Sequence, residues 1–66
     1  MKMHAKFIGR SCIAFEKDKI YQAIGYDPDQ NLVAVVDESN ENYLYSPELF
    51  EFGGDYHDLP IVSMFI

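Results

Sequence analysis

Short apolar runs alternate with polar turn residues roughly every eight to twelve positions along the chain, a pattern typical of an all-β protein. Residues 2–8 show the strand period most clearly, because Met3, Ala5 and Phe7 alternate with charged or polar side chains. No long window keeps the ~3.6-residue period of an amphipathic helix. We therefore predict a sheet and no α-helix.

Three further segments are rich in β-branched and aromatic residues and predict strands at 20–26, 32–37 and 43–45. The middle segment is apolar on both faces, as expected of a central strand. Polar stretches before and after it predict two hairpin turns. In the first turn, Pro28 fixes φ and Asp27 can accept a backbone N–H.

The stretch between the first two predicted strands, residues 11–19, lacks strand periodicity and predicts a long irregular loop. Three of its side chains, Cys12, Ile13 and Phe15, belong to types that are commonly buried. We expect these three to fold back onto the core.

The C-terminal third begins with turn chemistry. Ser46 before Pro47 resembles a helix start, but only about one turn fits, so we predict a 3₁₀ turn near residues 46–50. A short strand at 50–52 follows. A last strand at 61–65 would close the barrel beside the first strand or pair with another subunit.

The composition describes one small domain that fills residues 1–66, with 48% apolar and 15% aromatic residues, which excludes intrinsic disorder. A single cysteine, Cys12, excludes a secreted disulfide framework. The N-terminus lacks the apolar run of a signal peptide, and no segment approaches the ~20 apolar residues of a membrane helix. We expect a cytoplasmic protein that does not enter a membrane.

Charge is distributed unevenly along the chain. All five Lys and Arg residues lie within the first 19 positions, whereas nine of the 11 carboxylates, all but Glu16 and Asp18, lie beyond them. The net charge is −6. Because such a surface repels phosphate backbones, the charge argues against nucleic-acid binding, which would need the small basic region at the N-terminus.

The order of these elements resembles an SH3-like barrel. The resemblance is carried by KIYQAI (residues 19–24), VAVVDE (33–38) and YLYSPELFEF (43–52). It covers roughly residues 4–52 and leaves 53–66 as an extension. The chain is also similar to small uncharacterised SH3-like proteins of Gram-positive bacteria and their phages. The resemblance implies an all-β, small SH3-like barrel of five or six antiparallel strands in a bacterial or phage protein.

The chain departs from the SH3 domains that bind proline-rich peptides. Their ligand groove uses a tryptophan, whose position falls near Asn31 in a chain without any tryptophan. The turn positions fall on Ser46 and Leu49, and the first loop offers only Phe15. These departures argue against polyproline binding.

No pattern of catalytic or metal-ligating residues stands out. Zinc sites usually contain close pairs of Cys or His, and this chain has none. Cys12 with either histidine is the only nucleophile and base combination, and no spacing brings them together. We predict a non-enzymatic protein without metal or cofactor. The potential ligands considered are His4, Cys12, Asp55, His57 and Asp58.

The function predicted from these observations is a protein–protein interaction module, as a monomer or as a homodimer formed through an edge strand or the C-terminal tail. Tyrosine is enriched at interfaces, although core packing is the other interpretation of the same residues. The alternative function is an acidic decoy that inhibits a nucleic-acid-binding protein, and a weak nucleic-acid binder ranks last. The residues expected to contact a partner are Tyr21, Tyr26, Tyr43, Tyr45, Glu41 and Glu48.

Overall fold

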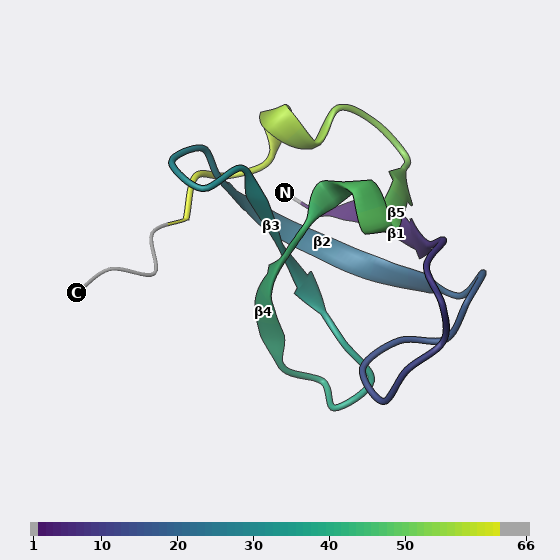
Figure 1. Cartoon of the computed structure of the whole chain (residues 1–66). Coiled ribbons are helices and arrows are strands. Elements are labelled where there is room, and N and C mark those ends of the chain that lie inside the picture. Colours follow the sequence, from purple (N-terminus) through teal and green to yellow (C-terminus); the bar gives the residue numbers. More distant parts are fainter. Residues whose placement is uncertain (1, 63–66) are drawn as a thin grey trace.

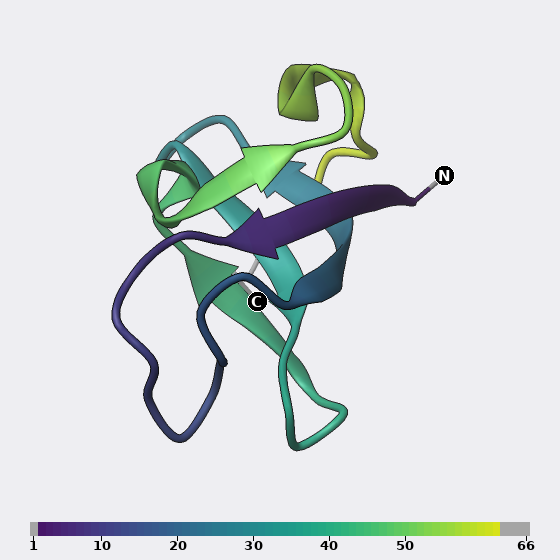
Figure 2. The same ribbon diagram turned by 90° about the vertical axis from the view of Figure 1, so that its right-hand side faces the viewer.

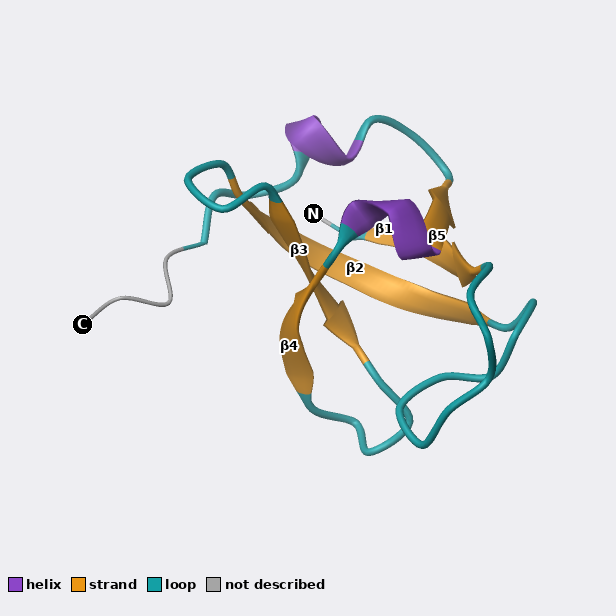
Figure 3. Cartoon of the chain, in the orientation of Figure 1, coloured by secondary structure: helices purple, strands orange, loops and turns teal. Residues whose placement is uncertain are grey.

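The computed structural model describes residues 2–62 and forms five antiparallel strands in one curled sheet (Figure 1). The order across the sheet is β4-β3-β2-β1-β5. Two 3₁₀ turns, η1 and η2, are the only helical elements of this part of the chain (Figure 3), and neither is long or apolar enough to cross a membrane. The elements are β1 (Met3–Phe7), β2 (Ile20–Asp27), β3 (Leu32–Val36), β4 (Asn42–Tyr45), η1 (Pro47–Leu49), β5 (Phe50–Phe52) and η2 (Tyr56–Asp58).

The all-β prediction is confirmed, and the strand ends agree with the expected ones to within about one residue. The first turn forms as predicted, because the Asp27 carboxylate accepts the backbone N–H of Asp29 at 3.0 Å. The predicted 3₁₀ turn is η1, where Pro47 occupies the first turn. β3 lies between β2 and β4, the central position that its two apolar faces indicated.

The alternation in β1 places its apolar residues on the core face of the sheet. Ala5 lies opposite Tyr21 of β2 and Phe52 of β5, and Phe7 lies opposite Phe50. β1 therefore lies between two strands that are far apart in the sequence, β2 and β5. Their inward side chains build one hydrophobic core.

Phe15, from the long loop between β1 and β2, is the centre of that core. Only 2% of its surface is exposed. Its ring lies 4.7–5.2 Å from the rings of Phe7, Tyr21, Tyr45 and Phe50, as measured between centroids. The loop therefore inserts an aromatic side chain where the sheet alone would leave the core open.

The other two loop residues expected in the core are not there. Ile13 is 99% exposed and Cys12 is exposed as well. The backbone N–H of Cys12 donates to the Phe15 carbonyl, and this tight turn at the loop tip leaves Ile13 in solvent. Phe15 fills most of the small space above the sheet, and of its neighbours in the loop the small side chain of Ala14 packs partly against the core.

The C-terminal segment differs from the prediction in two ways. It contains η2, which the sequence did not indicate, and Leu59 is buried in the core at 2% exposure. Of the predicted last strand, Ile61 forms a parallel bridge to Tyr26 of β2 and does not lie beside β1. Residues 63–65 of that strand lie outside the described residues.

Gly25 allows this close approach of the C-terminal segment to β2. A Cβ atom at Gly25 would overlap with Cγ1 of Val62, so any larger residue would displace the segment. The backbone of Tyr26 anchors the segment twice, because its N–H donates to the Pro60 carbonyl and its carbonyl accepts the N–H of Val62, both at 2.9 Å.

Candidate functional site

Tyr21 and Tyr26, two of the residues expected to contact a partner, are core residues with 7% exposure each. The Tyr21 hydroxyl donates to Glu38 Oε2 at 2.6 Å and accepts the backbone N–H of Glu16 at 2.7 Å. The Tyr26 hydroxyl donates to Asn31 Oδ1 at 2.7 Å. Burial raises the pKa of both phenols. Their rings contribute to packing, and their hydroxyl groups are bonded to polar side chains or to the backbone.

Tyr45 is half-buried and packs its ring edge-on against Phe15. Its hydroxyl donates to Asp37 Oδ2 at 3.0 Å. Burial, followed by this hydrogen bond to a carboxylate, raises the pKa of Tyr45 to about 12. Tyr45 therefore connects β4 to the turn between β3 and β4.

Tyr43 is the one predicted tyrosine with a largely exposed ring, at 51%. Its hydroxyl donates to Glu41 Oε1 at 2.8 Å, and this bond is the main cause of its raised pKa. Glu41 and Glu48 are both exposed. Of the six predicted contact residues, Tyr43 and these two glutamates lie on the surface.

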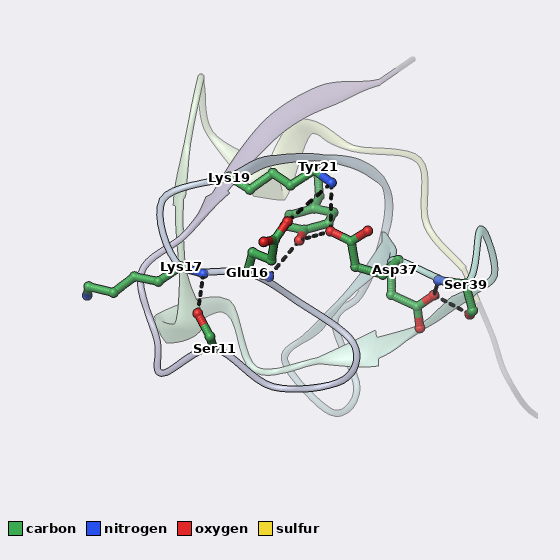
Figure 4. Close-up of polar contacts among 8 residues, drawn as sticks. Ser11, Glu16, Lys17, Lys19, Tyr21, Asp37 and Ser39 are labelled. Atoms are coloured by element: carbon green, nitrogen blue, oxygen red, sulfur yellow. Dashed lines mark hydrogen bonds and ion pairs between the residues drawn. The ribbon is translucent and has the colours of Figure 1, made fainter.

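A cluster of polar contacts clamps the long loop onto the turn between β3 and β4. Lys19 Nζ lies 2.8 Å from Glu38 Oε2 and 3.6 Å from Glu16 Oε2. Figure 4 shows Lys19, Glu16 and Tyr21 close together in this cluster. The backbone N–H of Glu38 also donates to the Ala14 carbonyl at 2.9 Å. The Lys19 ammonium and then the Tyr21 hydroxyl hold the pKa of Glu38 below its usual value. We call Glu16, Lys19, Tyr21 and Glu38 the loop clamp.

A cleft of about 380 Å³ lies between the β2–β3 turn, η1, β5 and η2. One part of its wall is aromatic, with the rings of Phe52 and Tyr56 5.0 Å apart. The other part is polar and carries the carboxylate of Glu48 as its one charged group. We call this cleft the aromatic cleft, and it is lined by Asn31, Ser46, Pro47, Glu48, Phe50, Phe52 and Tyr56.

Asn31 is held in an uncommon conformation at the rim of this cleft. Its φ is 55°, in the left-handed region that asparagine tolerates better than most residues. The side-chain oxygen of Asn31 accepts a hydrogen bond from the Tyr26 hydroxyl, so the side-chain N–H groups of Asn31 remain as donors. Within residues 2–62, neither these N–H groups nor the Ser46 hydroxyl nor the Glu48 carboxylate makes a side-chain hydrogen bond. The cleft thus presents two kinds of donor and one anionic acceptor.

A second cleft of about 390 Å³ lies beside the N-terminal end of β1. Asp55 at its edge caps η2 by accepting the His57 N–H, and it also contacts His57 Nδ1 at 2.7 Å. These bonds to His57 lower the pKa of Asp55. No three His, Cys, Asp or Glu residues of the described range are arranged to hold a metal ion. This cleft is lined by Lys2, Met3, His4, Gly53, Gly54, Asp55 and Asp58.

Comparison with known proteins gives no significant match to a family model, to a curated protein or to a solved structure.

Most residues that line the aromatic cleft were missing from the sequence prediction, which named only Glu48 among them. The sequence indicates Ser46 and Pro47 only as turn residues, and Asn31 only as the position of a tryptophan in SH3 domains. Tyr56 belongs to the tyrosines that composition suggests for an interface, but nothing in the sequence pairs it with Phe52, because their rings meet only when β5 and η2 fold over the end of the sheet.

Proposed function

We propose that this protein is a non-enzymatic protein–protein interaction module that binds an extended segment of its partner in the aromatic cleft. The observation that carries the proposal is the combination of the Phe52 and Tyr56 rings with polar side chains that have no partner within residues 2–62. Aromatic walls take up apolar side chains, while Asn31 and Ser46 can bond a peptide backbone. Glu48 would favour a partner with a nearby Lys or Arg.

We propose in addition that the fold is an SH3-like barrel. The strand order β4-β3-β2-β1-β5 and a 3₁₀ turn directly before β5 support this proposal, because both follow from the layout that the resemblance implies. In this arrangement β1 lies between β2 and the last strand, and a long loop follows β1. A polyproline ligand is not part of the proposal, because the chain has no tryptophan.

The proposed cleft can be tested by selecting displayed random peptides on the immobilised protein. We expect enriched peptides to carry a Lys or Arg beside an apolar residue. Asn31→Gly and Glu48→Lys should weaken their binding by about tenfold, the effect of one lost polar contact. Asn40→Gly is the matched control, because Asn40 also has a positive φ, 64°, but does not line the cleft.

Selected peptides that bind all three variants as tightly as the parent protein would overturn the cleft assignment. So would a selection that enriches no peptide. Amide chemical shifts at Asn31, Ser46 and Tyr56 provide the second measurement, since they should move on binding while those of the second cleft should not.

A second candidate function is that of an acidic decoy that inhibits a nucleic-acid-binding protein, and the scarcity of salt bridges to the carboxylates favours it. Beyond residue 19, only Glu38 forms a salt bridge with a lysine within the described residues. Asp55 contacts His57, and the other exposed carboxylates of this part have no lysine or arginine partner within residues 2–62, so they would attract a basic protein surface. Binding of a basic DNA-binding protein should be strong at low salt and should fall steeply as salt is added. Absence of binding at low salt would rule out this candidate.

A further inference from the structure

We propose that the free edge of β4 binds a basic, extended segment of the partner protein as an added antiparallel or parallel strand. This inference rests on the proposed interaction function and adds a second contact surface to it. β4 lies at one end of the strand order and leads directly into Ser46 and Pro47 of the aromatic cleft (Figure 1). A peptide paired with β4 can therefore extend into the cleft.

The hairpin register determines which backbone groups face outward from β4. Asp37 N–H donates to the Glu41 carbonyl at 2.9 Å, and β3 continues from there with Val36 opposite Asn42 and Val35 opposite Tyr43. Because N–H and C=O directions alternate along a strand, Tyr43 and Tyr45 use their backbone groups toward β3. The backbone N–H and C=O groups of Asn42 and Leu44 therefore point away from the sheet.

Within residues 2–62, the free edge of β4 lacks charged and proline residues, two of the usual devices that prevent strand pairing. Outside the strand ladders, no backbone hydrogen bond among residues 2–62 reaches β4. The opposite edge differs, because β5 has only three residues with Glu51 at its centre and is followed by two glycines. An unprotected edge of this kind is the surface that β-strand addition uses.

The charges around β4 indicate the chemistry of the added strand. Glu41 precedes the strand and Glu48 follows it, and both are exposed. A second copy of the chain paired with β4 would place Glu41 near Glu48 or near another Glu41, which is repulsive. A partner strand with Lys or Arg residues at its ends would instead be attracted at both.

The test uses two short synthetic peptides of alternating valine and threonine, one flanked by lysines and the other by glutamates. In the full protein, the lysine peptide should slow hydrogen exchange at the amides of Asn42 and Leu44, while the amides of Tyr43 and Tyr45, already bonded to β3, change little. Asn42→Pro removes one outward N–H and should weaken binding by about tenfold. Asn42→Ala keeps that N–H and should bind like the parent protein.

Several outcomes would overturn the inference. One is lysine-peptide binding without protection at Asn42 and Leu44, and another is equal binding of the glutamate peptide. Protection at these two amides that depends on protein concentration would instead assign the edge to a second copy. Should Asn42→Pro fail to fold, the exchange measurement on the parent protein still decides. Amide chemical-shift changes confined to Asn31 and Tyr56 would support the cleft proposal and overturn the edge proposal. Slowed hydrogen exchange at β4 without chemical-shift changes in the cleft would support the edge proposal and overturn the cleft proposal.

Discussion

The turn between β2 and β3 and the turn between β3 and β4 are built from the same local chemistry. Each begins with a buried aspartate, Asp27 or Asp37, that accepts the backbone N–H two residues later. Each contains an asparagine with positive φ, Asn31 or Asn40. On local grounds the two turns would be expected to have equivalent roles.

Their surroundings make them different. The carboxylate of Asp27 is used within its own turn, where it also accepts Gln30 Nε2 at 3.0 Å. Asn31 is bonded to Tyr26, and the turn borders the open cleft. This turn therefore leaves part of its polar surface available to a ligand.

The second turn is fastened to the rest of the molecule. Asp37 bonds Tyr45 of β4 as well as Ser39, and hydrogen bonds from these groups hold its pKa below the usual value. The neighbouring Glu38 is one of the two acidic residues of the loop clamp. Figure 2 shows the long loop and this turn extending from the same end of the sheet. The comparison teaches that proximity to the long loop decides whether a turn closes the fold or stays open.

Among these variants, removal of the Phe15 side chain should reduce stability most, because Phe15 lies at the centre of the core and comes from the loop that the loop clamp holds. Phe15→Ala should lower the free energy of unfolding by about 3–5 kcal/mol. That approaches the whole stability of a domain this size, at about 0.05–0.15 kcal/mol per residue. Ile13→Ala in the same loop is the control and should stay within about 0.5 kcal/mol, since Ile13 is 99% exposed. Urea unfolding followed by tyrosine fluorescence measures both, and equal losses would contradict the assigned role of Phe15.

Acid should weaken the clamped turn, where the carboxylates of Asp37 and Glu38 accept stabilising hydrogen bonds. The folded-state pKa values of Asp37 and Glu38 are lowered, by Ser39 and by Lys19 first, so their stabilisation is present above about pH 5 and is lost as pH falls through the lowered values. Melting temperatures between pH 7 and pH 3 should therefore decrease. Glu38→Gln should melt lower at pH 7 and show a shallower decrease. A variant that follows the parent curve at every pH would show that the clamp is not coupled to folding.

The smallest expected effect is a difference in stability between glycine variants of the two turn asparagines, Asn31 and Asn40. Asn31→Gly removes the acceptor of the Tyr26 hydroxyl and should lower the free energy of unfolding by about 1 kcal/mol. Asn40→Gly removes no side-chain hydrogen bond within the described residues and should change it by a few tenths of a kcal/mol, since glycine tolerates positive φ. Chemical denaturation of both variants measures the difference. Equal values would mean that the bond to Tyr26 contributes nothing.

Much of the fold could be predicted from residue patterns because its causes are local. The alternation in β1 and the Pro47 turn depend on neighbours in the sequence, and both appear where expected. Ile13 and Phe15 show where this reasoning stops. They are two residues apart and equally apolar, yet only one fits over the sheet.

The candidate surface was less predictable than the fold. Tyrosine content pointed to Tyr21 and Tyr26, whose rings the sheet buries. The sequence does not indicate Asn31 as a contact residue and does not single out Tyr56 among the tyrosines, because both become neighbours of Glu48 only after the β2–β3 turn, η1 and η2 converge. The positions of Glu41 and Glu48 before and after β4 follow directly from the sequence, but that β4 is an edge strand does not.

The amino-acid sequence by itself determined the strands, the turns and the excess of negative charge, because each depends on side-chain chemistry and on spacing over a few residues. The tertiary structure decided which loop residue completes the core, which turn is clamped by Lys19 and Glu38, and where an aromatic cleft remains. These choices depend on contacts between segments far apart in the chain, where shape and available volume select among side chains that are locally equivalent.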